Sequence, residues 1–425
     1  MNVIVIGGGI GGLALAQGLR GAGVPVQVYE RDAGPGQRWD GYRIHVNPVG
    51  ARALHACLPA PAWREFLATA GPGGDFGFLT SRLDELLVIE ESIMYPGGAA
   101  PTQGHYAADR TTLRRILATG LDEALHHGAE YVGHRTLPDG RVQARFADGR
   151  SAEGDVLVGA DGAGSRLRRQ YLPDVRIEEL GVVSVGHKVW LTEQTRATLP
   201  ARLTTGMNVV NAGHPVSMFS AVFAPPSAVS RPYLLCALIA RADLLPPDLL
   251  TLDDEALRVA VDVLVARWHP ALRRALAEAE PQTRNAIAFR ATAPLPAWSP
   301  SPVTVLGDAI HLMPPVGGLG GNTALRDAHL LARQLAVAHR DQRDPVSAIG
   351  AYEADMREYG PAAVRRAAAD AGQAASGGTV TAWGVRSWFR LCAAVPALRR
   401  RAFAGEWTSP AAPGTGNSRP PERGR

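Results

Sequence analysis

The sequence predicts an α/β fold in which a parallel-sheet domain is interrupted by a second, sheet-built domain and followed by C-terminal helices. Three observations lead to this prediction. The chain opens with an apolar strand, a glycine-rich turn, a helix and a second strand, which is the pattern of a βαβ unit. Between residues 175 and 293, β-like segments alternate with Pro-rich loops. From Val303 onward, a buried strand and long helices follow.

Each element rests on its own apolar pattern. In the first domain we expect strands over Val3–Ile6 and Val26–Tyr29, a helix over residues 11–19, a helix over 110–121, alternating segments from 131 to 146 and a strand over 155–160. In the second domain we expect strands over residues 182–191, Val216–Phe223 and 233–239, then a helix over 253–268. After the strand that begins at Val303, helices are expected over residues 322–339, 345–371 and 383–403.

These patterns divide the chain into five parts. The parallel-sheet domain takes residues 1–174 and 294–345, the inserted sheet domain 175–293, the C-terminal helices 346–407, and a tail 408–425. The tail is rich in Pro, Gly, Ser and Arg and has few apolar residues to offset the entropy of ordering, so we expect it to be disordered.

Composition narrows the class of protein. The formal net charge is +4, but the cations are scattered arginines with Lys188 as the one lysine, so no nucleic-acid partner is predicted. Cys57, Cys236 and Cys392 lie far apart, which argues against a disulfide framework or a metal site and favours a reducing cytoplasm. No apolar run is long enough to span a membrane, and the apolar start lacks a charged leader and a cleavage site. We therefore expect no signal peptide and no stable membrane association.

An arginine cluster near the C-terminus has two interpretations. Arg399, Arg400 and Arg401 follow an amphipathic segment, a pattern that can mark a helix on a membrane surface. The same pattern fits the solvated end of a packed helix. Because charge runs are usually surface features, the second interpretation is preferred.

The first motif that carries chemistry is a glycine fingerprint. Gly7, Gly9 and Gly12 satisfy G-x-G-x-x-G between a predicted strand and a predicted helix, and Glu30 follows at the end of the second strand. The first glycine allows a tight turn, the second lets a diphosphate approach the backbone, and the third lets the helix pack on the sheet. The helix N-terminus adds the positive end of a dipole, and Glu30 can accept hydrogen bonds from ribose hydroxyls. The sequence therefore predicts a Rossmann-like dinucleotide site.

Two further motifs decide which dinucleotide is bound. They lie at residues 155–168, DVLVGADGAGSRLR, and 305–328, VLGDAIHLMPPVGGLGGNTALRDA. In this order, the three motifs resemble those of the flavoprotein aromatic hydroxylases, the family of p-hydroxybenzoate hydroxylase, salicylate hydroxylase and the tetracycline-inactivating monooxygenase. The resemblance covers about half of the chain. It implies that FAD is the bound cofactor and that the inserted sheet domain binds the substrate.

The resemblance also assigns cofactor-binding roles. Gly307 and Asp308 place a carboxylate on the ribityl chain, whose hydroxyl donors suit an acceptor-only group. The glycine loop that follows turns backbone N–H groups to the pyrimidine side of the flavin, and the next helix stabilises negative charge on the reduced flavin. Relatives often have Gln at the position of Leu319. The predicted cofactor-binding residues are Gly7, Gly9, Gly11, Gly12, Glu30, Arg31, Arg43, Arg110, Asp161, Gly307, Asp308, Pro315, Gly318, Gly320, Gly321 and Asn322.

Three of these residues have an alternative interpretation or a specific partner. Asp161 contacts FAD or the pyridine nucleotide, or else caps a helix together with Ser165. Arg110 occupies the place of a family arginine that reaches FAD, and a planar guanidinium suits a pyrophosphate. Arg43 lies near the family's mobile arginine, although a solvated strand arginine fits equally well.

The resemblance implies the reaction as well. The chain has no second dinucleotide fingerprint, so NADPH or NADH is expected to dock only transiently. In the family, the reduced flavin reacts with O2 to a C4a-hydroperoxyflavin, which transfers oxygen to an electron-rich ring. We predict hydroxylation or epoxidation of an aromatic or polycyclic, mostly apolar molecule, in secondary metabolism, by a monomer or homodimer. Its cavity is expected beside the sheet within residues 182–239, where charges are few.

Catalytic residues cannot be assigned from the sequence. His45, His187, His214 and His311 are candidates for a general base, but a lone histidine is more often structural. A flavin-dependent reductase or dehydrogenase of the same fold, and a non-catalytic flavin sensor, stay open as alternatives. A halogenase is disfavoured, because the chain has neither the W-x-W-x-I-P motif nor an early lysine.

Overall fold

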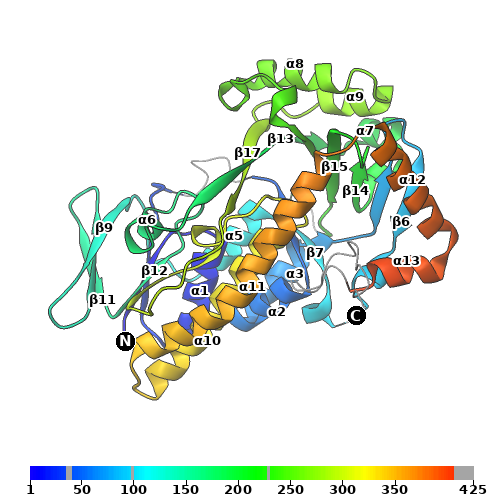
Figure 1. Cartoon of the computed structure of the whole chain (residues 1–425). Helices are drawn as coiled ribbons and strands as arrows, with labels where there is room; N and C mark the ends of the chain where they lie inside the picture. Colours follow the sequence, from blue (N-terminus) through cyan, green and yellow to red (C-terminus); the bar gives the residue numbers. More distant parts are fainter. Residues whose placement is uncertain (35–40, 97–99, 227–229, 406–425) are drawn as a thin grey trace, which may run out of the picture.

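Two sheets organise the chain, one of five parallel strands and one of seven mixed strands (Figure 1). They are seen in a computed structural model, which describes residues 1–34, 41–96, 100–226 and 230–405. Helix α11, Pro345–Ala374, runs from the parallel sheet to the seven-stranded sheet. The predicted α/β fold class is confirmed, whereas the tail predicted at residues 408–425 lies outside the described residues.

The parallel sheet has the strand order β18-β12-β1-β2-β8. Its strands are β1 Val3–Ile6, β2 Val26–Tyr29, β8 Leu125–His126, β12 Val156–Gly159 and β18 Val303–Val305. Most residues of β1, β12 and β18 are buried Val, Ile or Leu, as expected for strands covered on both faces. All neighbours in this sheet run parallel, so their carboxyl ends lie along the same edge.

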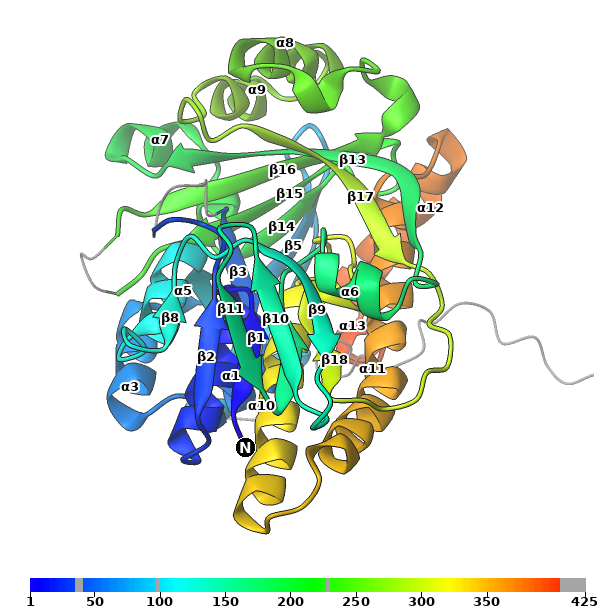
Figure 2. The same cartoon turned by 90° about the vertical axis from the view of Figure 1, so that its left-hand side faces the viewer.

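Helices and a small antiparallel sheet cover this parallel sheet. The elements are α1 Ile10–Gly21, α2 Pro48–Cys57, α10 Leu319–Arg340, α11 Pro345–Ala374, β9 Tyr131–Thr136, β10 Val142–Phe146 and β11 Ser151–Gly154. Helix α1 packs on α10, which packs in turn on α2 and α11. Leu325, Leu331 and Leu335 of α10 enter the core that these elements share. The small sheet, of order β11-β10-β9, lies on the side turned to the viewer in Figure 2.

The seven-stranded sheet has the order β17-β13-β16-β15-β14-β5-β6. Its strands are β5 Phe76–Leu79, β6 Glu85–Ile89, β13 Ile177–Trp190, β14 Met207–Val210, β15 Val216–Phe223, β16 Tyr233–Arg241 and β17 Asn285–Thr292. Five strands lie within residues 175–293, the range expected for an inserted sheet domain, and β5 and β6 come from an earlier part of the chain. These two short strands, of four and five residues, carry too little pattern to be detected from the sequence.

The pairing register sorts the residues of this sheet onto two faces. On the outer face, Val185 and Leu234 pack against helices that lie above the sheet in Figure 1. Gly186 and Phe219 lie on the inner face, which is turned to the parallel-sheet domain. A Cβ built on Gly186 would stand 2.7 Å from the ring of Tyr42, so the two domains approach each other closely here. The outer helices are α8 Asp254–Leu264 and α9 Pro270–Ala277.

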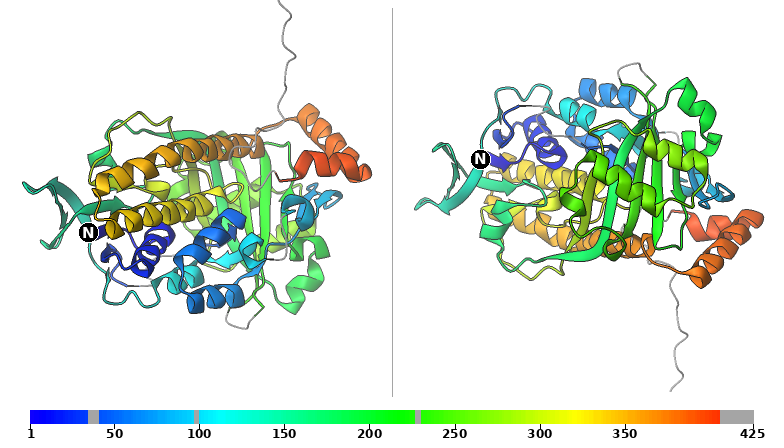
Figure 3. Two further views of the ribbon diagram at one scale, coloured as in Figure 1. Left: turned by 90° about the horizontal axis from the view of Figure 1, so that it is seen from below. Right: turned by 90° about the horizontal axis from the view of Figure 1, so that it is seen from above.

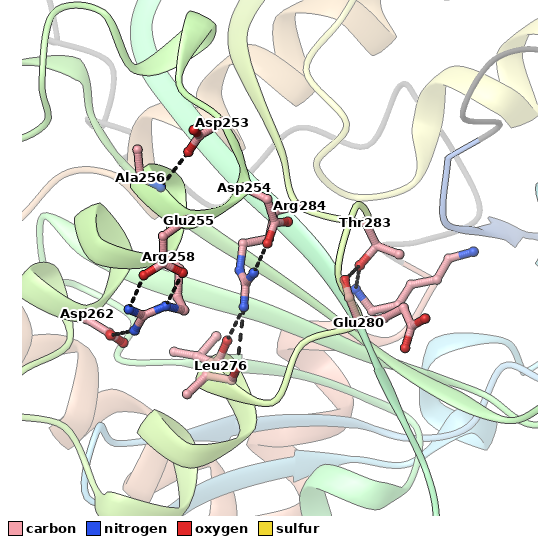
Figure 4. A network of polar contacts seen from close by, with 12 residues as sticks. Asp253, Asp254, Glu255, Ala256, Arg258, Asp262, Leu276, Glu280, Thr283 and Arg284 are labelled. Carbon is pink, nitrogen blue, oxygen red and sulfur yellow. Dashed lines mark hydrogen bonds and ion pairs between the residues drawn. The ribbon is translucent and has the colours of Figure 1, made fainter.

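Polar contacts fix these outer helices to the sheet (Figure 4). Asp253 caps α8 by accepting a hydrogen bond from the N–H of Ala256 at 2.9 Å. Arg284, just before β17, donates to the carboxylate of Asp254 and to the carbonyl oxygen of Leu276. Because only 4% of the Arg284 side chain is exposed, this contact joins α8, α9 and the edge of the sheet in a nearly dry environment.

His187 is buried on the same outer face. The alternation along β13 places it between Val185 and Val189, under α8 and α9. Neither ring nitrogen has a hydrogen-bond partner among the described residues. Burial, assisted by the nearby Arg284 charge, lowers the pKa of His187 to about 3. It therefore stays neutral in the folded protein at any moderate pH.

The variant His187→Leu is expected to make the free energy of unfolding depend less steeply on pH on the acid side of neutrality. A histidine whose pKa is lower in the folded state binds fewer protons there, so stability is full above pH 6.5 and falls as the pH drops towards about 3. His187 alone would lower the free energy of unfolding by up to about 1.4 kcal/mol for each pH unit in this range. Urea unfolding between about pH 7 and about pH 5 measures the slope. The exposed control His55→Gln should keep the wild-type slope, and an unchanged slope in His187→Leu would contradict the assignment.

The C-terminal helices close the far edge of the seven-stranded sheet (Figure 3). They are α12 Thr379–Ala394 and α13 Pro396–Phe403. Phe389 of α12 stacks on Phe78 of β5 with ring centroids 4.1 Å apart. Arg399 pairs with Glu90 at 3.1 Å, so the arginine cluster includes a packing contact. None of the helices in the described ranges combines the length and the apolar content needed to cross a membrane.

The structure also contains short helices and a small three-stranded sheet. They are α3 Ala60–Thr69, α4 Glu91–Met94, α5 Arg110–Ala118, α6 Arg166–Tyr171, α7 Glu193–Thr198 and a small sheet of β3 Arg43–Val46, β7 Tyr106–Asp109 and β4 Gly71–Pro72. Ala107 of β7 packs with Phe223 and Tyr233 of the seven-stranded sheet. The small sheet therefore lies where the two domains meet.

Candidate cofactor and active site

The three sequence motifs meet at one edge of the parallel sheet. Gly7 follows β1 and Glu30 follows β2, while Asp161 and Gly307 come shortly after β12 and β18. Because these strands are adjacent and parallel, all four positions lie at their carboxyl ends. In open α/β sheets, ligands bind at this edge.

The glycine turn after β1 leaves no room for a side chain at two positions and open space at a third. Gly7 has a φ of +113°, and a Cβ there would stand 2.3 Å from the carbonyl oxygen of Ala160. A Cβ on Gly12 would stand 2.1 Å from the carbonyl oxygen of Gly7, so only glycine lets α1 begin this close to the strand. A Cβ on Gly9 would meet nothing within 4 Å. Gly9 therefore presents bare backbone on an open side of the turn.

Glu30 and an arginine brace this turn. The Glu30 carboxylate accepts a hydrogen bond from the N–H of Gly8 at 2.7 Å. Arg114 donates to the carbonyl oxygen of Gly8 at 2.8 Å, and its guanidinium lies 3.6 Å from Glu30. A Cβ on Gly11 would come within 2.7 Å of Leu306, so this glycine permits close packing of α1 on the end of β18. The role of Arg114 could not be predicted from the sequence, since one arginine in a predicted helix carries no distinctive signal.

Asp308 and Arg110 come from separate motifs and lie near each other. The Asp308 side chain is exposed, yet its dense protein surroundings raise the pKa of its carboxyl, while the charges of Arg110 and His311 oppose that rise. Because the Asp308 carboxylate is accessible to solvent, a ligand can reach it. A Cβ on Gly41 would stand 3.4 Å from the Arg110 guanidinium.

Asn322 locks the glycine loop to strand β3. Its side-chain oxygen accepts a hydrogen bond from the N–H of Asn47 at 2.9 Å. Its amide donates to the carbonyl oxygens of His45 at 2.7 Å and Gly318 at 2.6 Å. Gly318 precedes α10 in the left-handed conformation, with φ of 65°, which favours glycine. This loop therefore has a fixed shape before any ligand binds.

The other predicted loop residues lie on its accessible side. Pro315 is exposed, and Gly320 and Gly321 are partly exposed in the first turn of α10. A Cβ on Gly320 would stand 3.8 Å from an Asp308 carboxylate oxygen. The first N–H groups of a helix have no partner within the helix, so they form a positive end close to this loop.

Beneath the loop lies a buried carboxylate that sequence analysis missed. Asp327 of α10 is fully buried and accepts hydrogen bonds from the N–H of Gly307 at 2.8 Å and from the His311 ring at 2.6 Å. Its other oxygen accepts from the hydroxyl of Tyr359. Arg326 lies over the Tyr359 ring at 3.7 Å. Asp327 thus anchors the backbone turn that presents Asp308, and it gives His311 a structural partner.

Two predicted residues make contacts that do not depend on a ligand. Asp161 accepts hydrogen bonds from Ser165 and from the N–H of Arg166, and Ser165 accepts from the N–H of Arg168, so both cap α6. Arg31 is exposed, with its guanidinium 4.0 Å from Asp32. Their contacts with a cofactor stay predictions.

Arg43 and His45 lie on the same face of β3. The Arg43 side chain is only 6% exposed, and its Nε and Nη2 atoms have no hydrogen-bond partner among the described residues. Burial lowers the pKa of Arg43 to about 10, with the phenols of Tyr233 and Tyr95 acting in the opposite direction. The His45 ring is hydrogen-bonded to Tyr95 at 2.8 Å, and a Cβ on Gly318 would touch His45. Arg43 is therefore no solvated strand residue.

The four candidate histidines separate in space. Only His45 lies against the glycine loop with a side chain near Arg43, and burial lowers its pKa well below the usual value. His187 is on the far face of the seven-stranded sheet, His214 contacts Arg386 at 3.2 Å, and His311 is held by Asp327. Within the described ranges, no group of three or more His, Cys, Asp or Glu side chains is arranged to hold a metal ion.

A Rossmann-like sheet whose carboxyl edge carries a glycine fingerprint, a strand-terminal Gly-Asp pair and a glycine loop before a long helix defines a flavoprotein. Comparison with known proteins agrees. The family model "FAD binding domain" matches residues 110–367, more than half of the chain, and "NAD(P)-binding Rossmann-like domain" matches residues 5–70. The chain belongs to the FAD-binding monooxygenase family, and FAD is its cofactor. The family predicted from the sequence is confirmed.

Several relatives illustrate this membership. A structure from Photorhabdus luminescens subsp. laumondii, assigned as an FAD-containing monooxygenase, is 32% identical, covers 88% of this chain and 98% of that chain, and has a TM-score of 0.80. The dual O-methyltransferase/FAD-dependent monooxygenase elcB of Phaeosphaeria nodorum is 31% identical over 84% of this chain. The match covers 43% of elcB, so the chain spans under half the length of that relative. Klebsiella pneumoniae HpxO, in complex with FAD and uric acid, shares the fold at 22% identity, over 96% of this chain and 97% of that chain, with a TM-score of 0.78.

Proposed function

We propose that this chain is an FAD-dependent monooxygenase that uses NAD(P)H and O2 to hydroxylate or epoxidise an aromatic or polycyclic small molecule. The observation that carries the proposal is the placement of the Gly318 loop and His45 opposite the inner face of the seven-stranded sheet. A flavin ring held by that loop would have the sheet as its neighbour. When bound and reduced, FAD supplies the activation of oxygen, and the protein supplies orientation and a dry surrounding.

The residues present fit FAD. Gly9 offers bare backbone to a diphosphate, with the N-terminus of α1 behind it. Glu30 has acceptor capacity left for ribose hydroxyls, and Asp308 is an accessible acceptor for the ribityl hydroxyls. Arg110 brings positive charge to the same side. The first turn of α10 would stabilise negative charge that develops on the flavin.

The inner face of the seven-stranded sheet supports a mostly apolar substrate. Phe219, Leu235 and Phe223 lie on this face, and Val316 of the glycine loop packs in the same cluster as Ile239. Apolar and aromatic side chains with a few polar groups are typical of sites for small aromatic molecules. A role in secondary metabolism is part of this proposal, and the relative elcB, whose name joins a monooxygenase to an O-methyltransferase, fits it. The three free buried cysteines support a reducing compartment.

Oxygen uptake by the purified yellow protein tests the proposal. A panel of phenols and polycyclic aromatics is screened with NADPH and then NADH, with catalase added to reveal uncoupled peroxide. We expect one compound class to stimulate NAD(P)H oxidation and to gain a single atom of oxygen derived from labelled O2. A product without added oxygen would favour a reductase or dehydrogenase instead. A flavin that neither nucleotide reduces would favour a sensor.

The variant Asp308→Asn is expected to weaken FAD binding roughly 10-fold or more, since a charged acceptor for hydroxyl donors is lost. Equilibrium dialysis of FAD against the apoprotein measures this change. The exposed control Asp122→Asn should bind FAD like the wild type. Wild-type affinity in Asp308→Asn would show that this carboxylate is not in the cofactor site.

A further inference from the structure

Arg43 is a buried cation whose charge is not balanced within the described chain. Its side chain is 6% exposed, and two of its three guanidinium nitrogens are buried without a partner. Buried charges in proteins are normally paired, because moving an ion out of water carries a large desolvation penalty. An unpaired buried guanidinium therefore points to a partner that is not part of the described protein.

The described carboxylate opposite Arg43 in the sheet is already engaged. Asp109 lies opposite Arg43 in the β3–β7 pairing. One of its oxygens caps α5 by accepting from the N–H of Thr112 at 3.0 Å, and the other accepts from the hydroxyl of Tyr233 at 3.3 Å. The groups that oppose the lowering of the Arg43 pKa are the phenols of Tyr233 and Tyr95. Burial raises the pKa of both phenols, so neither carries a negative charge at ordinary pH.

The position of Arg43 indicates which side the partner comes from. Tyr233 belongs to the inner face of the seven-stranded sheet, and His45, two residues along β3, touches the glycine loop. Arg43 thus lies between the sheet and the loop. A second cation, Lys188, extends over the Tyr233 ring at 4.7 Å. Burial lowers the pKa of Lys188 and the charge of Asp109 opposes that shift, so two cations, Arg43 and Lys188, stand near one carboxylate.

We propose that Arg43 binds an anionic oxygen group of the substrate, a carboxylate or phenolate on an otherwise apolar aromatic body. This inference rests on the proposed function and narrows its substrate class. The guanidinium fork matches a carboxylate in two parallel hydrogen bonds, and pairing supplies the missing countercharge. The aromatic body would lie along Phe219 and its neighbours, while Arg43 sets which end of the molecule faces the loop.

Binding to the FAD-loaded wild-type protein gives the first test, and it needs no turnover. The probes are 1-naphthoate and 1-naphthamide, which have the same ring and differ in charge. Titration followed by the flavin absorption spectrum should show the acid binding roughly 10- to 100-fold more tightly than the amide. The acid should also raise the thermal unfolding midpoint more than the amide at equal concentration. Equal binding of both probes would overturn the proposal.

Two substitutions locate the effect. R43Q should abolish the preference for the acid and leave binding of the amide unchanged, whereas R43K should keep part of it because the charge remains. Arg231→Gln, which replaces an exposed cation that stacks on Trp190 at the end of strand β13, is the matched control and should keep the full preference. R43Q is expected to fold, since it removes an unbalanced buried charge, and its thermal midpoint should not fall. A preference that survives in R43Q would overturn the proposal.

The flavin itself is the competing anion. Affinity for sulfite reports how well a site stabilises negative charge on the flavin. If R43Q weakens sulfite binding and leaves the ratio between acid and amide unchanged, Arg43 serves the cofactor and the proposal is wrong. The proposed function fails separately, if no aromatic compound gains oxygen. Selective binding of the acid without oxygen transfer would uphold the role of Arg43 and remove only the monooxygenase assignment.

Discussion

Replacing Asp327 by Asn is expected to lower the free energy of unfolding by about 2–4 kcal/mol. The carboxylate is fully buried and accepts hydrogen bonds from the N–H of Gly307, the His311 ring and the Tyr359 hydroxyl. An amide has one acceptor oxygen and one donor nitrogen, so at least one of these donors would face another donor. Urea unfolding of the apoprotein measures the loss.

The same variant should also weaken FAD binding, because the turn at Gly307 presents Asp308. Asp341→Asn is a suitable control at the C-terminal end of the same helix, since its contacts with Arg340 and Arg343 are at the surface. Surface pairs contribute little, and this variant should lose less than about 1 kcal/mol. If both variants lose equally little stability, Asp327 is not the anchor described above.

The second large effect is expected at Gly12. A Cβ at this position would stand 2.1 Å from the carbonyl oxygen of Gly7, and neither the strand nor the helix can move without disturbing the turn. Gly12→Ala should therefore destabilise the protein by about 1–3 kcal/mol and strongly reduce FAD binding. Thermal unfolding and the ratio of bound FAD to protein report both effects.

Two other glycines of the same segment separate steric clash from cofactor contact. A methyl group on Gly9 would meet no protein atom within 4 Å, so Gly9→Ala should fold like the wild type and still bind FAD poorly. Gly21, near the end of α1, is equally open, and Gly21→Ala should be neutral or stabilising by roughly 0.5–1 kcal/mol, with normal FAD binding. Normal FAD binding in Gly9→Ala would mean that the diphosphate does not approach this turn.

Much of the fold follows from local patterns. The strands at Val3–Ile6, Val26–Tyr29 and Val216–Phe223 coincide with those predicted, because apolar runs bounded by glycine, proline or charged residues leave little choice of structure. The two strands at Phe76–Leu79 and Glu85–Ile89 could not be placed in the second sheet. The pairing of β5 with β14 joins distant parts of the chain, and nothing in a short segment specifies a distant partner.

The residues of the candidate site also fall into two groups, those that the sequence predicts and those whose role appears only in the folded structure. The glycine turn after β1 could be predicted from its spacing between a strand and a helix, and the Gly307–Asp308 turn from the resemblance of its motif to that of the aromatic hydroxylases. Arg114 and Asp327 could not, because their roles depend on what lies beside them after folding. A charged residue on a helix is usually solvated, and only the structure shows that Asp327 is buried beneath the turn. The unpaired state of Arg43 is likewise a property of its surroundings.

The origin of the seven-stranded sheet limits how this protein can be recombined with its relatives. A gene fragment encoding residues 175–293 would supply five strands and leave the recipient to provide the two that complete the sheet. His214, which lies within the fragment, contacts Arg386 of helix α12 at 3.2 Å. If that fragment alone were swapped to exchange substrate preference, its contacts with β5 along β14 and its contacts with α12 would therefore be mismatched. A successful chimera must carry residues 76–89 and the C-terminal helices with the fragment.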